Sequence, residues 1–514
     1  MWLIGGVEAG AELVRLLGCG VRQFVVCGGA RNAAILEWLG KLEGVEVWSH
    51  FEERGAGFFG LGRTMATGEA CGVVVTSGTA VAELLPAVVE AYYQGRPLVV
   101  ISADRPERFW GTGAPQVIEQ EGIFGGYAER ELGSWDGRRP LHLNVPLEEV
   151  GRIAGHEAGE SEWKAEKMSF ETGSLAQWLR EDIFRGLVVL VGGLEEGERE
   201  EVYYFCRSLG VPVLADATSG LREALEDLVL VDGDRILREA KPGKVLRLGD
   251  VPLGRFWRDL EELPEVEVFS VTRTGFTGLA RESLILQGEI ERVIKGLGEV
   301  EEVGDVLELW PKSRRRGNEL VELLEAYPES EPALLRELSL FGAQGDSVFL
   351  GNSLPIREWN DFGQRELPVT LVRACRGANG IDGQLSAWLG ATAEEDEAWG
   401  VFGDVTVLYD LAAPHLLEQV EQRKRVLVVV NNDGGRIFER LPRMAGMGER
   451  ARAWMRTAHG RAFGEWARMW DLSYVRVENR EDFDRLEHLE LGTTVVELVP
   501  DGGQSELFWE AWKK

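Results

Sequence analysis

Short apolar runs alternate with amphipathic stretches along most of the chain. The runs QFVVCGG, CGVVVTSG and PLVVISAD each end in a turn, and the stretches ARNAAILEWLGKL and TAVAELLPAVVEAYYQ follow the first two with helical periodicity. Such runs are typical of parallel strands buried on both faces and joined by crossover helices. The pattern therefore predicts an α/β fold built from doubly wound parallel sheets.

The same pattern starts again twice further along the chain. GLVVLVGG precedes the helical stretch EGEREEVYYFCRSLG and the runs VPVLAD and KVLRLGD; a third series contains SVFLGNS, LPVTLVRA, WGVFGD and KRVLVVVNN. We interpret the charged, weakly periodic segments 155–173 and 309–319 as linkers, with the arginines at 314–316 solvated. Three domains are predicted, at residues 1–165, 166–325 and 326–514.

The composition excludes several classes of protein. Of 514 residues, 86 are Asp or Glu and 56 are Lys or Arg, which gives a formal net charge of −30. Nucleic acid and anionic membranes require a concentrated basic face, so neither is an expected partner. Apolar residues make up 44% of the chain, enough to form real cores. Because the net charge is strongly negative, any anionic ligand must be bound by local arginines.

Targeting signals and disulfides are not predicted. No stretch approaches the roughly 18 uncharged apolar residues of a spanning helix, and the first segment, MWLIGGVEAGAELVRLL, carries Glu and Arg where a signal peptide would be apolar. We therefore expect a cytoplasmic protein. The cysteines, at 19, 27, 71, 206 and 375, form no C-x-x-C pair, which argues against disulfides and structural zinc.

Two polar turns in the last third suggest a site for a diphosphate and a metal ion. Gly403-Asp404 ends the run WGVF, and residues 431–435 (NNDGG) end the run RVLVVV. In a parallel sheet both turns lie at the carboxyl edge, where ligands of open α/β folds bind. Asp404, the amide oxygen of Asn432 and a carbonyl near Gly434 are hard ligands that suit Mg²⁺ completed by phosphate oxygens and water.

The sequence does not favour other phosphate-binding sites. No G-x-x-x-x-G-K-[ST] occurs, and the glycine pair at 192–193 in the middle block lacks the G-x-G-x-x-G spacing, which disfavours a nucleotide-dependent kinase and a Rossmann dehydrogenase.

Glu53 lies where the strand VEVWSH meets a Gly- and Ala-rich helix. Apolar packing raises the pKa of such a carboxyl group, which can then exchange a proton near neutrality. The alternative is an acid that only stabilises the helix N-terminus.

The next strand ends in Thr76-Ser77-Gly78-Thr79-Ala80, whose hydroxyls and amides can line a small polar ligand. This turn lacks the G-x-S-x-G motif, which disfavours a hydrolase.

Together these features resemble thiamine-diphosphate enzymes, in which a Glu and a T-S-G turn belong to one domain and GD followed by NN to another. In detail the chain is similar to the 2-succinyl-5-enolpyruvyl-6-hydroxy-3-cyclohexene-1-carboxylate synthase (MenD) family. The resemblance spans about residues 23–442 and is weak in the middle domain. The segments that carry this resemblance are VVCGGARNAAIL, HFEERGAGFFGLG, VVVTSGTAVAELLPAVVEA, ISADRPERF, GAPQVIEQEGIFG, GNSLPIREW, RGANGIDGQLS, GDVTVLYDL and VVVNNDGGRIFERLP.

This resemblance implies an architecture and a reaction. The three domains would be a pyrimidine-binding domain, a central transhydrogenase-III-like domain and a diphosphate-binding domain, in a homodimer or homotetramer with active sites between chains. The cofactors would be thiamine diphosphate and Mg²⁺ or Mn²⁺. The reaction would be decarboxylation of 2-oxoglutarate and 1,4-addition of the succinyl carbanion to isochorismate, a transferase step of menaquinone biosynthesis.

The resemblance also implies roles for individual residues. Glu53 would contact the pyrimidine N1′ and drive the amino–imino exchange that activates the cofactor, and Ile381 would bend the cofactor. Cofactor contacts would come from Thr76, Ser77, Gly78, Ser353, Ile381, Gly403, Asp404, Val405, Asn432 and Ile437, and metal ligands from Asp404, Asn432 and Gly434. Substrate contacts would come from Arg31, Asn32, Arg105, Gln116, Arg255, Ser353, Arg357, Arg376, Ile437, Phe438 and Leu441.

Two positions depart from the family's pattern, and two alternatives stay open. Ala30 stands in place of a serine, whose hydroxyl contact would be worth about 0.5–1.5 kcal/mol, and Pro115 replaces the usual Asn. One alternative is another thiamine-diphosphate 2-oxoacid decarboxylase or carboligase, although the small number of histidines, six, disfavours a His-pair decarboxylase. The other is a non-catalytic binding protein of the same fold.

Overall fold

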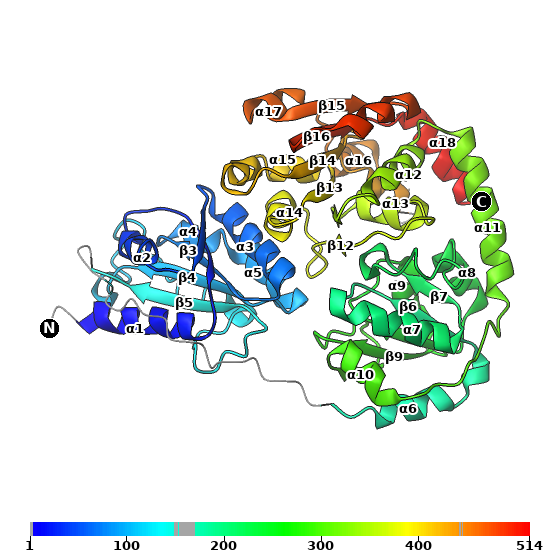
Figure 1. Ribbon diagram of the computed structural model, residues 1–514, viewed down its shortest axis with the longest axis horizontal. Coiled ribbons are helices and arrows are strands. Elements are labelled where there is room, and N and C mark those ends of the chain that lie inside the picture. The colour runs from blue at the N-terminus through cyan, green and yellow to red at the C-terminus, as the bar shows by residue number, and fades with distance from the viewer. Residues whose placement is uncertain (1–3, 149–152, 154–169, 442–443, 445) are drawn as a thin grey trace. The chain divides into compact units, whose positions relative to one another are not determined.

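The computed structural model describes residues 4–148, 153, 170–441, 444 and 446–514 and contains three parallel β-sheets (Figure 1). The chain forms two compact units. The first comprises residues 1–167, 375–394 and 406–422, and the second residues 168–374, 395–405 and 423–514. One sheet lies in the first unit and two in the second, so the predicted fold class is confirmed.

The first sheet has the strand order β2-β1-β3-β4-β5, and all its pairings are parallel. Every residue of β3 and β4 is buried, as continuous apolar runs predict. The strands are β1 Gln23–Val26, β2 Glu46–Ser49, β3 Cys71–Val75, β4 Leu98–Asp104 and β5 Leu141–Pro146. The helices are α1 Ile4–Gly18, α2 Ala33–Leu39, α3 Glu53–Thr67, α4 Thr79–Ala82 and α5 Leu85–Gln94.

The predicted helix over residues 79–94 is divided in two. Helix α4 ends at Ala82, and α5 begins at Leu85 with Pro86 in its first turn. Proline has no backbone N–H to donate to the preceding turn and its ring clashes with the carbonyl four residues before it, so one continuous helix is disfavoured there.

Helix α3 is held in the first unit by a close helix crossing. Its partner is α14 (Gln384–Ala391), which belongs to the same unit. A Cβ atom added to Gly62 would lie 2.1 Å from the carbonyl oxygen of Ala387, and one added to Gly390 would lie 2.1 Å from that of Phe59. Only glycine permits such an approach. Because Glu53 is the first residue of α3, this crossing positions it.

The second sheet has the order β10-β9-β8-β6-β7 and helices on both faces. Helices α6, α7 and α10 pack on one face, and α8, α9 and the start of α11 on the other. The strands are β6 Leu187–Val191, β7 Val213–Ala215, β8 Lys244–Leu248, β9 Glu267–Thr272 and β10 Leu284–Gln287. The helices are α6 Gly173–Arg180, α7 Arg199–Leu209, α8 Gly233–Ala240, α9 Arg255–Asp259, α10 Ile290–Leu297 and α11 Leu309–Ala326.

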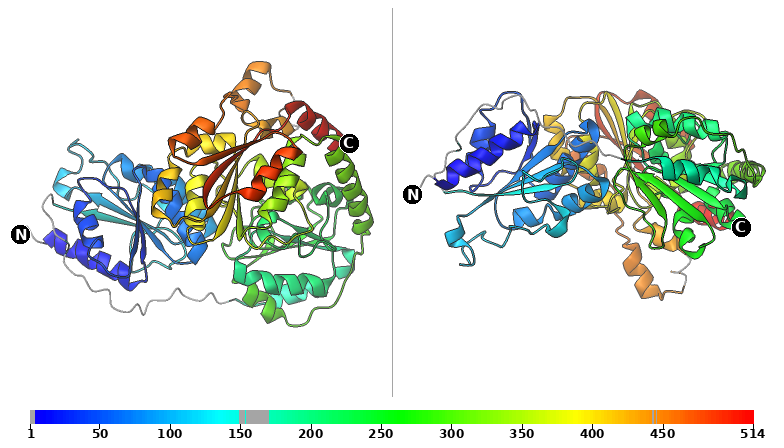
Figure 2. Two further views of the ribbon diagram at one scale, coloured as in Figure 1. Left: turned by 45° about the horizontal axis from the view of Figure 1, so that its top comes forward. Right: turned by 90° about the horizontal axis from the view of Figure 1, so that it is seen from below.

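The third sheet has the order β12-β11-β13-β14-β16-β15 and is again parallel throughout (Figure 2). Its strands are β11 Ser347–Leu350, β12 Val372–Arg373, β13 Glu397–Gly403, β14 Lys424–Val430, β15 Ser473–Val477 and β16 Gly492–Leu498. The helices are α12 Glu331–Gly342, α13 Leu354–Phe362, α15 Asp404–Tyr409, α16 Glu449–Arg456, α17 Gly464–Met469 and α18 Gly502–Trp512, with a 3₁₀ helix η8 at Arg436–Arg440.

One of the two predicted linkers is wrong. Residues 309–319 form the first half of α11, in which Leu309, Ser313 and Arg316 are buried. The helical repeat places these residues on one face. Arg316, expected to be solvated, pairs with Asp232 at 2.7 Å, and its guanidinium carbon lies 4.0 Å from the centre of the Trp512 ring.

The structure describes only some of the residues at which the other linker and the domain limits were predicted. The segment 155–169 of the other predicted linker and the limit at 165/166 lie outside the described residues, whereas Gly173 begins α6. The limit at 325/326 falls at the C-terminal end of α11.

Among the described helices, none is both long and apolar enough to cross a membrane. The five cysteines are free thiols.

Within the second unit, buried polar contacts join the part of the chain that carries the second sheet to the part that carries the third. The guanidinium of Arg222, fully buried, donates to the carbonyl oxygens of Trp359, Asn360 and Gln364, the last two at 2.8 Å. The Ala217 N–H donates to Oδ1 of Asn360 at 2.9 Å. These bonds tie the loop after β7 to α13.

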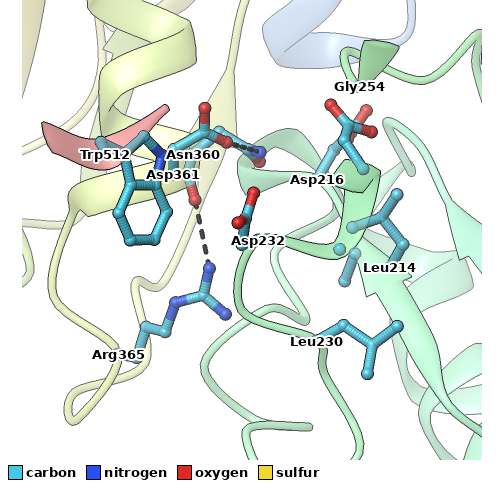
Figure 3. A pocket seen from close by; sticks show the side chains of 12 residues that line it. Leu214, Asp216, Leu230, Asp232, Gly254, Asn360, Asp361, Arg365 and Trp512 are labelled. Carbon is cyan, nitrogen blue, oxygen red and sulfur yellow. Dashed lines mark hydrogen bonds between the residues drawn. The ribbon is translucent and has the colours of Figure 1, made fainter. Parts of the chain in front are cut away.

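A small cavity of about 40 Å³ lies at the same junction (Figure 3). Asp232, Asp234 and Asp361 line it, together with Arg365. Burial, and then the charge of Asp234, raises the pKa of Asp361 to about 7. The neutral acid is therefore the form that the fold favours.

We predict that Asp361→Asn stabilises the protein at high pH. The wild-type carboxyl contributes its full stability below its ordinary pKa of 3.8, and this contribution is lost as pH rises through about 7. The asparagine stays neutral, so its thermal midpoint should exceed the wild-type value by about 2–6 °C above pH 7 and match it near pH 4. Thermal unfolding across this pH range measures the difference. The exposed control Asp484→Asn should show no such pH dependence, and an equal response of the two variants would contradict the prediction.

Candidate functional site

Three loops meet at the carboxyl edge of the first sheet. A Cβ atom added to Gly29 would lie 2.7 Å from Cβ of Thr76, so the loop after β1 contacts the turn after β3. Gly78 has φ 83°, and a Cβ atom there would lie 3.2 Å from Cα of Gln116. The structure thus brings Thr76, Gly78 and Gln116 together. The side-chain oxygen of Thr76 is buried without a hydrogen-bond partner among the described residues.

Arginines lie at the same edge. Arg31 follows β1 and donates to the Leu147 carbonyl oxygen at 3.4 Å, and Arg105 directly follows β4. Asn32 is fully buried: its amide donates to the Cys27 carbonyl at 2.8 Å, and its side-chain oxygen accepts the Gly29 N–H at 2.9 Å. Asn32 therefore holds the turn that presents Arg31, while Ala30 is exposed.

Glu53 is half-buried at the first position of α3. Burial raises its pKa, and the neighbouring acids Glu52 and Glu83 add to this effect. Close by, Nδ1 of His50 accepts the Glu52 N–H at 2.8 Å, and burial together with His415 lowers the pKa of His50 to about 4. The imidazole is therefore neutral at neutral pH and does not hold Glu53 in its ionised form.

The loop that carries Arg376 and Ile381 is anchored by a buried acid that sequence reasoning missed. Glu90 of α5 is 3% exposed, and its carboxylate accepts the N–H groups of Gly377 at 2.6 Å and Ala378 at 2.7 Å. A Cβ atom added to Gly377 would lie 2.5 Å from the Glu90 carbonyl oxygen. An acid inside an apolar helix face is the sequence signal that could have found it.

The second unit carries the other group of predicted residues. Parallel pairing sets Gly403 of β13 opposite Val430 of β14, so the two polar turns emerge side by side. The Asp404 carboxylate accepts the Gly434 N–H at 2.8 Å and the Val405 N–H at 2.6 Å. Burial raises the pKa of Asp404, and these N–H groups offset part of the effect. Nε2 of His459, a residue that sequence reasoning missed, lies 3.1 Å from the carboxylate.

Asn432 faces the buried acid Glu331, beside which lies a second buried acid, Glu358. Its side-chain nitrogen donates to both carboxylate oxygens of Glu331, at 2.9 and 3.0 Å, and its side-chain oxygen is buried without a hydrogen-bond partner among the described residues. Glu331 and Glu358 are at most 1% exposed. Burial raises the pKa of both, their proximity raises that of Glu358 further, and the Arg440 guanidinium opposes the shift.

These residues fit a hard divalent cation. Asp404 supplies a carboxylate, Asn432 an unsatisfied amide oxygen and Gly434 a carbonyl. Gly434 has φ 112°, and a Cβ atom there would lie 2.2 Å from the Arg456 carbonyl oxygen, so only glycine fits. Within the described ranges no group of three or more His, Cys, Asp or Glu could hold a metal, so phosphate oxygens and water would have to complete the coordination.

The remaining predicted residues of this unit occupy three places. Ser353 follows β11 with φ 80°, and its carbonyl oxygen accepts from Arg357 at 2.6 Å. Phe438 and Leu441, in and after η8, line a cavity of about 770 Å³ with Met444, Met447 and Met455. Ile437 precedes Phe438 in η8. Arg255 begins α9 and pairs with Asp259 at 3.3 Å, in the helical layer of the second sheet.

Comparisons with known proteins show the family of this chain. Residues 8–123 match the sequence profile "Thiamine pyrophosphate enzyme, N-terminal TPP binding domain". The 2-succinyl-5-enolpyruvyl-6-hydroxy-3-cyclohexene-1-carboxylate synthase of Akkermansia muciniphila is 47% identical over 95% of both chains. The enzyme of the same name from Bdellovibrio bacteriovorus is 36% identical over 98% of both chains. The chain belongs to this synthase family.

A solved structure supports the fold independently. Benzoylformate decarboxylase from Polynucleobacter necessarius superposes with a TM-score of 0.73 over 96% of this chain and 98% of that chain, at 12% identity. This similarity confirms the thiamine-diphosphate-enzyme fold and says nothing about the substrate. Membership of the synthase family therefore rests on the sequence relationship.

We predict that Glu90→Ala loosens residues 376–382. The variant removes the acceptor of the Gly377 and Ala378 N–H groups, at a cost of about 0.5–1.5 kcal/mol for each hydrogen bond. Hydrogen exchange should then accelerate at Gly377 and Ala378, while the exposed control Glu83→Ala leaves their exchange unchanged. Wild-type protection of both amides in Glu90→Ala would show that the carboxylate does not hold this loop.

Proposed function

We propose that this chain catalyses the thiamine-diphosphate-dependent decarboxylation of 2-oxoglutarate and the 1,4-addition of the succinyl unit to isochorismate. The products would be CO₂ and 2-succinyl-5-enolpyruvyl-6-hydroxy-3-cyclohexene-1-carboxylate, for menaquinone biosynthesis in the cytoplasm. The observation that carries the proposal is the 47% identity over 95% of the chain, which extends across both site-bearing units. The enzyme is a transferase.

Residues of the first unit suit the cofactor's chemistry. Thiamine diphosphate, when bound, supplies an electron sink for the electron pair that is freed when a 2-oxo acid loses CO₂. Burial raises the pKa of Glu53, which favours its holding and returning a proton at a ring nitrogen. The unsatisfied hydroxyl of Thr76 is available to a polar ligand group, as are the neighbouring Ser77 and Gly78.

Residues of the second unit suit the diphosphate and its cation. Asp404, Asn432 and the Gly434 carbonyl would hold Mg²⁺ or Mn²⁺, and Gly403 and Val405 flank the carboxylate. The buried, unpaired oxygen of Asn432 supports this assignment because an unsatisfied buried acceptor is costly.

Arginines would bind the substrates, which are both dicarboxylates. The guanidinium fork pairs with a carboxylate through two parallel hydrogen bonds. Arg31, Arg105 and Arg376 lie in the first unit and Arg357 in the second, whereas the Arg255 side chain is 53% exposed and paired with Asp259. Phe438 and Leu441 would form the apolar wall for the ring of isochorismate.

The central role of Glu53 is tested by Glu53→Gln. Glutamine cannot exchange the proton, so we expect turnover to fall by about 10²–10⁴-fold while affinity for thiamine diphosphate stays within about tenfold. An assay for the isochorismate adduct, with and without thiamine diphosphate, measures turnover. The matched control Glu52→Gln keeps an acceptor for the Gly55 N–H and should retain most activity.

Two outcomes of this assay would contradict the proposal. Near-normal turnover of Glu53→Gln would exclude the proton role. Release of CO₂ by the wild type without formation of the adduct would favour another 2-oxoacid decarboxylase instead.

We also propose a homodimer or homotetramer with active sites between chains, built from the three predicted domains. Mixing inactive Glu53→Gln with inactive Asp404→Ala, followed by subunit exchange, tests it. If each site combines Glu53 of one chain with Asp404 of the other, one of the two sites in each mixed dimer is intact. About half of the dimers are mixed after equal exchange, so about a quarter of wild-type activity should return. Absence of any recovery after verified exchange would place both residues of a site in one chain.

A further inference from the structure

Glu331 contacts the predicted metal ligand Asn432 through its side chain. It is the first residue of α12, is 1% exposed and lies 101 positions before Asn432 in the sequence. Its backbone N–H donates to the Ser505 hydroxyl at 2.9 Å, and Ser330 caps the helix by accepting the Ala333 N–H. The backbone that carries Glu331 is therefore held from two sides.

The carboxylate distinguishes the two ends of the Asn432 amide. Both oxygens of Glu331 accept from the amide nitrogen, at 2.9 and 3.0 Å, so the amide oxygen must point the other way. That oxygen is buried and has no hydrogen-bond partner among the described residues. The main chain of Asn432 is fixed separately, because its carbonyl accepts from Nε of Arg436 at 3.0 Å. Only rotation of the side chain could reverse the amide.

We propose that Glu331 is a positioning residue that keeps the amide oxygen of Asn432 directed at the divalent cation. This inference rests on the proposed function, which places a cation at Asp404, Asn432 and Gly434. The two ends of an amide are nearly equal in size, but only the oxygen can ligate a cation. Partners that orient a metal ligand commonly change metal affinity by about 10–100-fold when they are removed.

A second buried acid offers a matched control. Glu358 is also fully buried and lies beside Glu331, and it accepts from Nε1 of Trp509 at 3.3 Å. Its only described link to the proposed metal site is through Glu331. Replacement of Glu358 by Gln makes the same change of carboxyl to amide in the same pocket without changing the group that faces Asn432.

The test is titration calorimetry of MgCl₂ into protein that is saturated with thiamine diphosphate. In Glu331→Gln, the new amide can face either orientation of Asn432, so Mg²⁺ affinity should fall by about 10–100-fold. Glu358→Gln should stay within about threefold of the wild type. Thermal unfolding confirms that each variant is folded, and the calorimetric readout does not depend on turnover.

The double variant separates orientation from general damage. In Asn432→Asp both ends of the side chain are oxygens, so there is no orientation to fix, and the new carboxylate faces Glu331 unfavourably. Adding Glu331→Gln to Asn432→Asp should therefore strengthen Mg²⁺ binding, the opposite of its effect in the wild type. This comparison also carries the test if the single Glu331→Gln variant does not fold.

Each result has a distinct meaning. If the wild type shows no Mg²⁺-dependent binding, the proposed metal site itself is overturned, and the role of Glu331 with it. If the wild type binds Mg²⁺ and Glu331→Gln binds it equally well, only the positioning role is overturned. An equal loss of affinity on adding Glu331→Gln to the wild type and to the Asn432→Asp variant would mean structural damage and would likewise overturn the positioning role.

Discussion

The parallel pairing of β13 with β14 is the interaction on which the candidate metal site depends. It sets Gly403 opposite Val430, so Asp404 and the turn at 431–435 leave the sheet at one edge, where the Gly434 N–H reaches the Asp404 carboxylate at 2.8 Å. A shift of one residue in this register would turn the side chains of one strand to the opposite face. The long apolar runs of both strands are buried almost throughout, which places this pairing inside the sheet.

Buried charged side chains also hold helices of the second unit in place. Arg222, Arg316 and Glu331 are nearly inaccessible, and each has hydrogen bonds or an oppositely charged partner. A charge taken out of water is strongly destabilising when its partner is removed, by about 3–5 kcal/mol. These groups therefore constrain how α11, α12 and α13 pack, and Glu331 does so in direct contact with Asn432.

The net charge of −30 acquires a clearer meaning from the fold. A strongly acidic molecule does not attract dicarboxylates over long distances. The strand order of the first sheet nevertheless places Arg31 and Arg105 at one edge, because both follow the carboxyl ends of parallel strands. Local arginines and a bound cation would thus provide the attraction that the whole-molecule field does not.

The sequence was sufficient for the fold class, for many of the strands and for the polar turns at Asp404, Asn432 and Thr76, because burial periodicity and turn chemistry are local properties. It did not predict β5, β9, β10, β15 or β16. It misjudged residues 309–319, whose many charges concealed a helix with one buried face. It also missed Glu90 and Glu331, the acids that hold the 376–382 loop and the Asn432 amide. Those two contacts join residues 287 and 101 positions apart. Which acid meets which amide at such a separation depends on how helices pack against sheets, and no local pattern encodes that packing. Sequence patterns alone therefore locate the groups that can do the chemistry, whereas tertiary packing decides which neighbours orient them.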